Sequence, residues 1–179
     1  MKEAIGVMEF SSIARGMLTA DRMMKAARIR LLKAATVCPG KYILLFAGQV
    51  DDVSTAIRLG KQVGGEYVVD ELELPHVHAQ VIPAILQISE IGRTEAVGVM
   101  EFYSVTSGIQ AADIAAKAAA VQLLEIRIGY AVGGKGLVLL TGDLEAVKTA
   151  LEAAGKNQEF LLQRSLIARP EAEFLQNLY

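Results

Sequence analysis

Cysteine is nearly missing from this sequence. It occurs once in 179 residues, as Cys38, and tryptophan does not occur at all. One thiol excludes an internal disulfide, and it cannot complete a metal site by itself. A chain with so little cysteine fits a reducing compartment such as the cytosol. Two further features are absent. No apolar run reaches the roughly 18 residues of a membrane span, and the first ten residues lack the apolar core of a signal peptide.

Neither sign of charge is in excess. The chain carries 18 basic and 20 acidic residues, for a net charge of -2. This balance gives no electrostatic basis for binding nucleic acid, so we expect neither nucleic acid nor a membrane as a partner. The length fits one large domain or two small ones. With 53% hydrophobic residues, the chain has either a large internal core or additional apolar surface that is buried between subunits.

What the sequence does contain is an internal repeat. The segment EAIGVMEFSSIARGMLTADRMMKAARIRLL from Glu3 matches EAVGVMEFYSVTSGIQAADIAAKAAAVQLL from Glu95, an offset of 92 residues. After an insertion of two residues in the second copy, GKYILLFAGQVDDVSTAI from Gly40 matches GKGLVLLTGDLEAVKTAL from Gly134. We therefore predict two copies of one domain, residues 1–92 and 93–179, joined by the short polar segment SEIGRTE at residues 89–95.

Both copies show the same order of predicted elements. Period-2 and apolar segments predict strands, and apolar residues at helical spacing predict helices, one of them capped by Ser11 or Ser12. In the first copy the strands are expected at residues 4–10, 29–37, 41–48 and 66–74, and the helices at 12–28, 51–62 and within 78–89. The order strand–helix–strand–strand–helix–strand is the split βαβ pattern of ferredoxin-like α/β (α+β) folds. We expect the helices on one sheet face, leaving the other face or the domain edges for contacts with further copies.

Two motifs with possible ligand chemistry fail on their context. GYAVGGKG at residues 129–136 nearly fits the phosphate-binding loop, but Gly136 replaces the Ser or Thr, and a strand follows where a helix is needed. A flexible glycine turn between two strands is the better interpretation. His76 and His78 lie on one side of an extended segment with no third ligand nearby in the sequence, so we favour surface histidines over a zinc site.

The remaining polar residues do not indicate an enzyme. Asp70, Glu71 and Glu73 alternate along a predicted strand and are interpreted most simply as a solvated edge. No Ser-His-Asp or Cys-His arrangement has supporting sequence context. We therefore expect no catalytic residues.

The segments AIGVMEF, the helix with AADxxxKAA, the strand that begins with GK, and the closing LIARPE resemble the bacterial microcompartment shell domain. Both copies match in unpermuted order, so the resemblance covers nearly the whole chain. It implies a tandem-domain shell protein that assembles as a homotrimer. Six domains then form a pseudohexamer around a pore, and such hexagons tile the microcompartment shell together with other shell proteins. The Cys-Pro-Gly-Lys turn and the glycine-rich second turn are most similar to the iron–sulfur shell proteins of propanediol-utilisation compartments.

The resemblance also implies roles at the tile edge. Lys25 in ADRMMK and Lys117 in ADIAAK match a helix lysine that lies between neighbouring hexagons. The alternative is that each lysine is a solvated residue paired with the aspartate four positions earlier, worth about 0.3–0.5 kcal/mol. Arg169 in ARP matches a second edge position, which His76 occupies in the first copy.

In the family, the turn between the second and third strands lines the pore. Here that turn comprises Thr36, Val37, Cys38, Pro39 and Gly40. Threefold symmetry would bring three Cys38 thiolates to one axis, where they can hold three irons of a 4Fe–4S cluster. The resemblance therefore implies one cluster per trimer. The corresponding second-copy turn, IGYAVGGK, is longer and lacks a thiol, and we expect it to fold away from the axis.

Alternatives remain open at this stage. Cys38 can be a small buried hydrophobe, or three thiolates with a water can bind zinc. A shell tile can pass electrons, or an intact cluster, between the encapsulated enzymes and the cytosol, with a redox partner in the lumen or the cytosol. Such a tile can instead provide a pore for small metabolites. A third function class is a tandem regulatory domain that binds a small effector and forms dimers or tetramers but no sheets.

Overall fold

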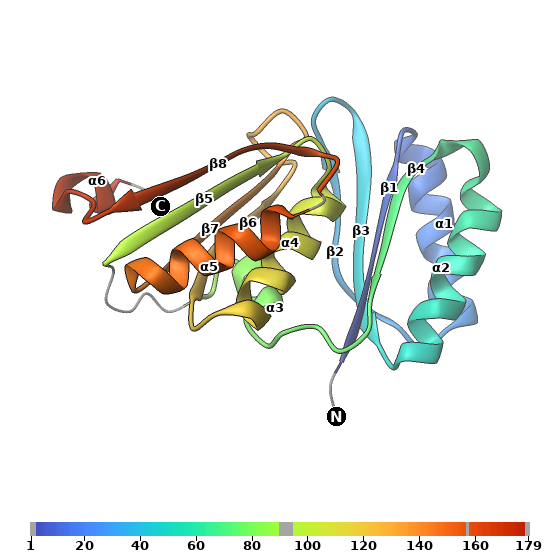
Figure 1. Ribbon diagram of the computed structural model, residues 1–179. Helices are drawn as coiled ribbons and strands as arrows, with labels where there is room; N and C mark the ends of the chain where they lie inside the picture. Colours follow the sequence, from blue (N-terminus) through green and yellow to red (C-terminus); the bar gives the residue numbers. More distant parts are fainter. Residues whose placement is uncertain (1–2, 90–94, 157, 178–179) are drawn as a thin grey trace. The chain divides into compact units, whose positions relative to one another are not determined.

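The computed structural model describes residues 3–89, 95–156 and 158–177, and it confirms the predicted order of elements in both copies (Figure 1). The first copy contains β1 (Ala4–Phe10), α1 (Ile13–Ala26), β2 (Arg30–Val37), β3 (Lys41–Gly48), α2 (Val50–Gly64), the 3-10 turn η1 (Gly65–Tyr67), β4 (Val68–Leu74) and α3 (Val81–Ile85). The second copy contains β5 (Ala96–Phe102), α4 (Val105–Ala118), β6 (Gln122–Ile128), β7 (Gly136–Gly142), α5 (Leu144–Gly155), β8 (Leu161–Ala168) and α6 (Ala172–Gln176). The predicted joint at residues 89–95, with its boundary at 92, lies almost wholly outside the described residues.

Each copy forms a four-stranded sheet, in the orders β2-β3-β1-β4 and β6-β7-β5-β8. All neighbouring strands are antiparallel. This is the ferredoxin-like arrangement, so the predicted α/β fold class is confirmed. The two sheets also share an irregularity, because the pairing with the outer strand shifts between Glu9 and Phe10 in β1 and between Glu101 and Phe102 in β5. The repeat in the sequence is therefore a repeat of backbone geometry as well.

Local chemistry explains where the first helix of each copy begins. The Ser12 hydroxyl accepts a hydrogen bond from the Arg15 backbone N–H at 3.3 Å, and Ser104 does the same for Ser107. A serine cap satisfies one of the backbone donors that a helix start leaves unpaired. The cap predicted at Ser11 or Ser12 is thus confirmed at Ser12. In both copies the two long helices pack against each other on the same face of their sheet (Figure 1).

The core of the first copy lies between the central strands and these helices. All residues of β1 are buried, and Phe10 and Phe46 are among the largest side chains with no exposed surface. Gly6 of β1 is paired with Phe46 of β3, and the Phe46 ring occupies the space above Gly6. A Cβ at Gly6 would lie 2.3 Å from Phe46 Cε2. The small residue is therefore required by the ring across the strand pair.

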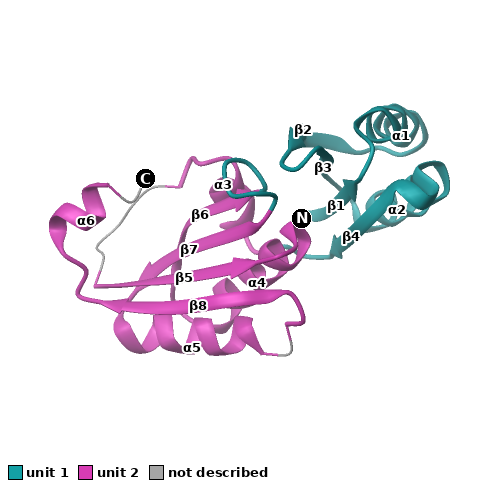
Figure 2. Cartoon of the chain, turned by 90° about the horizontal axis from the view of Figure 1, so that it is seen from above, with its two compact units in different colours: residues 1–77, 129–134 teal, residues 78–128, 135–179 magenta. Residues whose placement is uncertain are grey.

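The chain divides into two compact units, and these do not coincide with the two sequence copies (Figure 2). Unit 1 comprises residues 1–77 and 129–134, and unit 2 comprises residues 78–128 and 135–179. The segment that carries α3 thus belongs to unit 2, although it ends the first sequence copy. Conversely, the second-copy glycine turn belongs to unit 1. Among the described residues, no helix has the length and apolarity needed to cross a bilayer.

Gly6→Ala is expected to lower the free energy of unfolding by about 1–3 kcal/mol, because the added methyl group overpacks the core against the Phe46 ring. This cost exceeds the ~0.5–1 kcal/mol that alanine gains over glycine inside a regular element. Urea unfolding at fixed protein concentration measures the change. In Gly6→Ala/Phe46→Leu the smaller side chain should recover part of the loss. A double-mutant cycle without coupling between the two positions would contradict this account.

Candidate functional site

The turn between β2 and β3 carries the only cysteine. Val37 at the end of β2 is buried, whereas Thr36, Cys38, Pro39 and Gly40 are exposed. The turn is closed by a hydrogen bond of 2.9 Å from the Gly40 N–H to the Val37 carbonyl oxygen. Gly40 has a φ of 100°, which glycine adopts without strain, and the Cys38–Pro39 peptide bond is cis. The local sequence therefore presents the thiol at the tip of a short hairpin.

The exposure of Cys38 decides between two of the sequence interpretations. In the single chain the thiol is not a small buried hydrophobe. The described part of the chain contains no group of three or more His, Cys, Asp or Glu side chains that could hold a metal ion. Of the two histidines singled out in the sequence, His76 is exposed and His78 is half-buried. A metal at Cys38 would need ligands from several chains.

The second-copy glycine turn packs against the cysteine turn within unit 1. A Cβ at Gly134 would lie 2.3 Å from the Cys38 carbonyl oxygen, and one at Gly129 would lie 2.9 Å from Val37 Cβ. Both glycines have positive φ, 81° and 75°. The Gly134 N–H donates to the Gly129 carbonyl oxygen at 3.2 Å, which holds the segment in shape. Within the chain this segment lies directly on the backbone of Cys38, and its expected position relative to the axis stays a prediction.

This contact also explains why GYAVGGKG is rich in glycine although it is not a phosphate-binding loop. The glycines of residues 129–134 provide close backbone approach, and β7 follows them where a phosphate site would need a helix. The structural interpretation of GYAVGGKG as a turn between two strands is confirmed. Its contact partner in the first copy could not be read from the sequence, because nothing in the repeat places the two inserted residues against Cys38.

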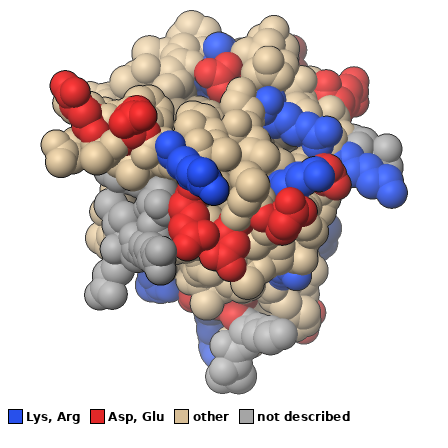
Figure 3. Space-filling view, turned by 60° about the vertical axis from the view of Figure 1, so that its left-hand side comes forward, with Lys and Arg blue, Asp and Glu red and all other residues tan. Residues whose placement is uncertain are grey.

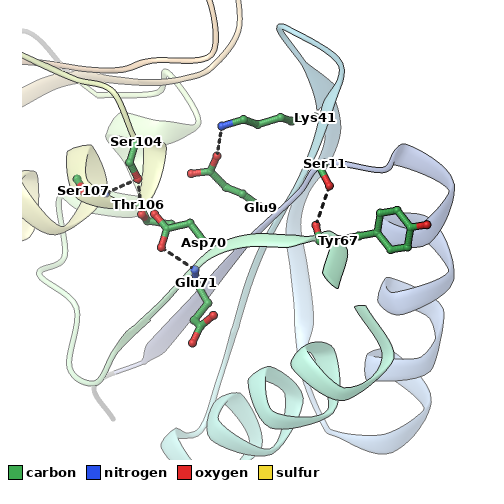
Figure 4. A network of polar contacts seen from close by, with 9 residues as sticks. All are labelled: Glu9, Ser11, Lys41, Tyr67, Asp70, Glu71, Ser104, Thr106 and Ser107. Atoms are coloured by element: carbon green, nitrogen blue, oxygen red, sulfur yellow. Dashed lines mark hydrogen bonds and ion pairs between the residues drawn. The ribbon is translucent and has the colours of Figure 1, made fainter. Parts of the chain in front are cut away.

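A buried ion pair lies next to the cysteine turn and was not found from the sequence. Lys41, the first residue of β3, approaches the Glu9 carboxylate of β1 at 3.1 Å, and the Glu9 side chain is only 1% exposed (Figure 4). In the second copy Lys135 and Glu101 form the corresponding pair at 3.6 Å, with Glu101 39% exposed. Removing one partner of a buried pair leaves an uncompensated charge. The Lys41–Glu9 pair therefore anchors the start of β3, whereas the second-copy pair is 38% and 39% exposed and contributes little. The recurrence of GVMEF and GK in both copies is the sequence signal that could have indicated these ion pairs.

The predicted tile-edge residues occupy equivalent positions in the two copies. Lys25 and Lys117 each pair with the aspartate four residues earlier, at 2.7 Å and 2.5 Å, as the i,i+4 spacing predicts. Both lysines keep much of their side chain exposed, 70% and 45%. His76 and Arg169 follow the last strand of their copies, and both have left-handed backbones, with φ of 60° and 49°. The predicted correspondence between them is thus supported by conformation, while the role at a tile edge stays a prediction.

The acidic strand β4 lies at the edge of its sheet, as predicted, but its acidic side chains are not simply solvated. Asp70, Glu71 and Glu73 are half-buried in β4. Glu71 forms an ion pair with Lys61, and Glu73 accepts a hydrogen bond from Ser54. Both partners lie on α2, so the acidic residues connect the strand to the helix. On the face shown in Figure 3, acidic and basic side chains are interspersed, in keeping with the balanced composition.

Comparison with known proteins assigns the two copies to a family. The family model described as BMC domain matches residues 4–77 and again residues 96–170. The chain therefore belongs to the BMC-domain family, as a tandem-domain shell protein of bacterial microcompartments.

Relatives support the tandem arrangement. The chain is 41% identical over 174 residues to the bacterial microcompartment shell protein PduT of Citrobacter freundii, covering 95% of this chain and 94% of that protein. A crystal structure of a microcompartments protein from Desulfitobacterium hafniense DCB matches with a TM-score of 0.92 at 41% identity, covering 98% of this chain and 99% of that one. A fused permuted hexameric shell protein of the RMM microcompartment matches with a TM-score of 0.64 at 21% identity over 86% and 82% of the two chains, which shows the fold alone.

Gly134→Ala is expected to disturb the cysteine turn, because its Cβ would collide with the Cys38 carbonyl oxygen. Gly133→Ala is the matched control, since Gly133 also has a positive φ (64°) but has nothing within 4 Å of an added Cβ. Both variants bear the left-handed penalty of about 1–2 kcal/mol, and Gly134→Ala adds the collision. Only Gly134→Ala should change the alkylation rate of the Cys38 thiol severalfold. Equal rates in the two variants would show that the glycine turn does not position Cys38.

Proposed function

We propose that three copies of this chain form a pseudohexameric shell tile whose central pore binds one 4Fe–4S cluster through three Cys38 thiolates. The observation that carries the proposal is the exposed thiol at the tip of the β2–β3 turn, held by the glycine segment that packs on its backbone. The likeness to the PduT shell protein over nearly the whole chain supports the tile.

The donor chemistry of the turn fits a cluster only in an assembly. Thiolate is the preferred ligand of iron–sulfur clusters, and one chain supplies one thiolate. Three chains on a threefold axis would supply three, which leaves one iron open to water, a small ligand or a partner protein. When bound, the cluster would supply one-electron transfer at the centre of the tile.

The residues around Cys38 have defined tasks in this proposal. Pro39 and the Gly40–Val37 hydrogen bond restrict the turn, so that little conformational entropy is lost when the thiolate binds iron. The Gly129–Gly134 segment fixes the backbone of Cys38 from the other side. Lys41 directly after the turn is paired with Glu9, and this pairing anchors the strand that begins there.

The tile would pass electrons, or an intact cluster, between the two sides of the shell and would catalyse no reaction itself. A redox partner in the lumen or the cytosol would meet the open iron. In the competing function the pore admits a small metabolite and Cys38 holds no cluster, and the same experiment separates the two.

The test is anaerobic purification of the wild type and of Cys38→Ser, with visible absorption, EPR, and iron, sulfide and zinc analysis of the assembled protein. We expect a broad thiolate-to-iron absorption band and about four irons per three chains at full loading, both lost in Cys38→Ser. A colourless, iron-free assembly after anaerobic reconstitution with iron and sulfide would overturn the cluster. Zinc in its place would indicate a trithiolate zinc site, and the absence of any metal would favour a metabolite pore.

A second prediction concerns the edges of the tile. Lys25→Glu/Lys117→Glu should abolish assembly into flat sheets, seen by electron microscopy, because an anionic side chain then replaces the cationic one at both proposed edge positions. Lys25→Glu should leave the trimer intact, because Lys25 and Asp21 form an exposed i,i+4 pair worth about 0.3–0.5 kcal/mol. Lys117 pairs with Asp113, whose side chain is only 5% exposed, so far-UV circular dichroism and sedimentation must first check that the double variant keeps its fold and its trimer. Sheets that form as in the wild type would contradict the edge role of both lysines.

A further inference from the structure

Each copy has a groove between its second long helix and the outer strand of its sheet. The groove of the first copy lies between α2 and β4 and is lined by Ser54, Ile57, Arg58, Lys61, Glu71 and Glu73. The groove of the second copy lies between α5 and β8 (Figure 1) and is lined by Lys148, Leu151, Glu152, Arg164, Ser165 and Leu166. The second groove, here called the α5–β8 groove, has a volume of about 180 Å³ and lies wholly within unit 2.

In the first copy the acidic side chains that line the groove are matched across it. Glu71 of β4 forms an ion pair with Lys61 of α2, and Glu73 accepts a hydrogen bond from the Ser54 hydroxyl. Each acidic side chain of the strand therefore has a donor on the helix. Arg58 adds only a single exposed cation. This groove consequently offers little concentrated charge to a ligand.

The repeat places different side chains at the same positions of the α5–β8 groove. The alignment of α5 with α2, and the equal register of β8 on β5 and of β4 on β1, give the counterparts Lys148 for Ser54, Gly155 for Lys61, Arg164 for Glu71 and Leu166 for Glu73. Both acidic residues of the strand are thus replaced, one by a cation and one by an apolar residue. The hydroxyl on the helix is replaced by a second cation.

The Arg164 guanidinium is fixed by the end of α5. Its Nη1 donates to the Leu151 carbonyl oxygen at 2.9 Å, and it lies over Gly155, where an added Cβ would be 2.7 Å from Nη1. A cation at this end of a helix is also favoured by the helix dipole. Since a guanidinium has five N–H donors, this single hydrogen bond orients the group and leaves further donors for a ligand.

Lys148 brings a second positive charge to the same groove. It lies on one side of α5 with Leu151 and Glu152, because residues three and four positions apart are neighbours on a helix. Within the described part of the chain, neither Lys148 nor Arg164 forms an ion pair with a carboxylate, Glu152 included. Two cations that face one groove repel each other, and an anion bound between them would remove this repulsion.

We propose that the α5–β8 groove binds a small organic oxyanion, namely a carboxylate or phosphate group with a short apolar chain. Arg164 donates to the oxyanion with its planar fork, and Lys148 contributes a point charge. The apolar chain packs on Leu151, which is 5% exposed, and Leu166, which is 41% exposed. The groove is smaller than the roughly 300 Å³ of the smallest usual ligand pockets, so the ligand has only a few carbon atoms.

This site goes beyond the proposed cluster and does not depend on it. The groove belongs to unit 2, whereas the Cys38 turn belongs to unit 1. The test therefore uses the full chain in a Cys38→Ser background, which keeps iron out of the measurement. The probes are inorganic phosphate, followed by phosphorus NMR line width, and butyrate, followed by proton saturation-transfer NMR. Phosphate tests the charge alone, and butyrate tests the charge together with the apolar floor.

We expect Lys148→Gln and Arg164→Gln each to weaken binding of the probe at least fivefold. Arg164→Lys should recover only part of the loss, because it keeps the charge without the fork. Glu152→Gln should strengthen binding severalfold, because it removes a negative charge from the groove. The matched control is Arg58→Gln, which removes an exposed cation from the corresponding groove of the first copy and should leave the affinity unchanged.

The outcomes distinguish a site from general attraction of ions. Equal losses in Arg58→Gln and Lys148→Gln would overturn the proposal, as would the absence of binding by both probes up to about 10 mM. Binding of one probe only, lost in Lys148→Gln, would support the site and assign its ligand to the phosphates or to the carboxylates. Lys148 is exposed, so Lys148→Gln is expected to fold, and far-UV circular dichroism checks every variant.

Discussion

Unit 2 depends on one interaction, in which the segment that carries α3 packs on the edge strand β6 and on α4. Two helices shield one face of each four-stranded sheet, and β6 at the edge of the second sheet also contacts α3. In unit 2 that segment comes from the preceding sequence copy, through the backbone contact of His78 with Asp113 and the double hydrogen bond of Gln80. Because residues 78–88 pack on α4 and β6, the boundaries of the compact units differ from those of the sequence copies.

The two copies keep a common frame and differ at the turn between their second and third strands. The serine caps, the shifted pairing after Glu9 and Glu101, and the lysine at the start of β3 and of β7 occur in both copies. The turns themselves differ. The first presents a thiol, and the second contains glycines that fit against the backbone of the first. The two turns therefore differ in that one presents the thiol and the other packs on its backbone.

Much of the fold could be predicted because its causes are local or periodic. The strand at residues 4–10 and the helix capped at Ser12 follow from apolar spacing and capping chemistry, and the repeat doubled the evidence for each element. The exposed thiol on the β2–β3 turn followed from a family resemblance rather than from the residues alone. The BMC-domain match now gives that resemblance an independent basis.

What could not be predicted depends on contacts between segments far apart in the sequence. The acidic strand of Asp70, Glu71 and Glu73 has the alternation of a solvated edge, and only the position of α2 provides Lys61 and Ser54 as partners. The burial of Glu9 by Lys41 and the contact of Gly134 with Cys38 are of the same kind. Periodicity describes one element at a time, so it carries no information on which loop meets which.

The glycine segment that lies on the cysteine turn makes the order of the two copies meaningful. Under the proposed arrangement, a ring built from six first copies would carry twice as many thiols, yet no Gly129–Gly134 segment would lie on any of them. A ring built from six second copies would have the glycines and no thiol. Only the fused chain puts both in fixed one-to-one proportion, so the covalent link between the copies also sets the stoichiometry of thiol and support.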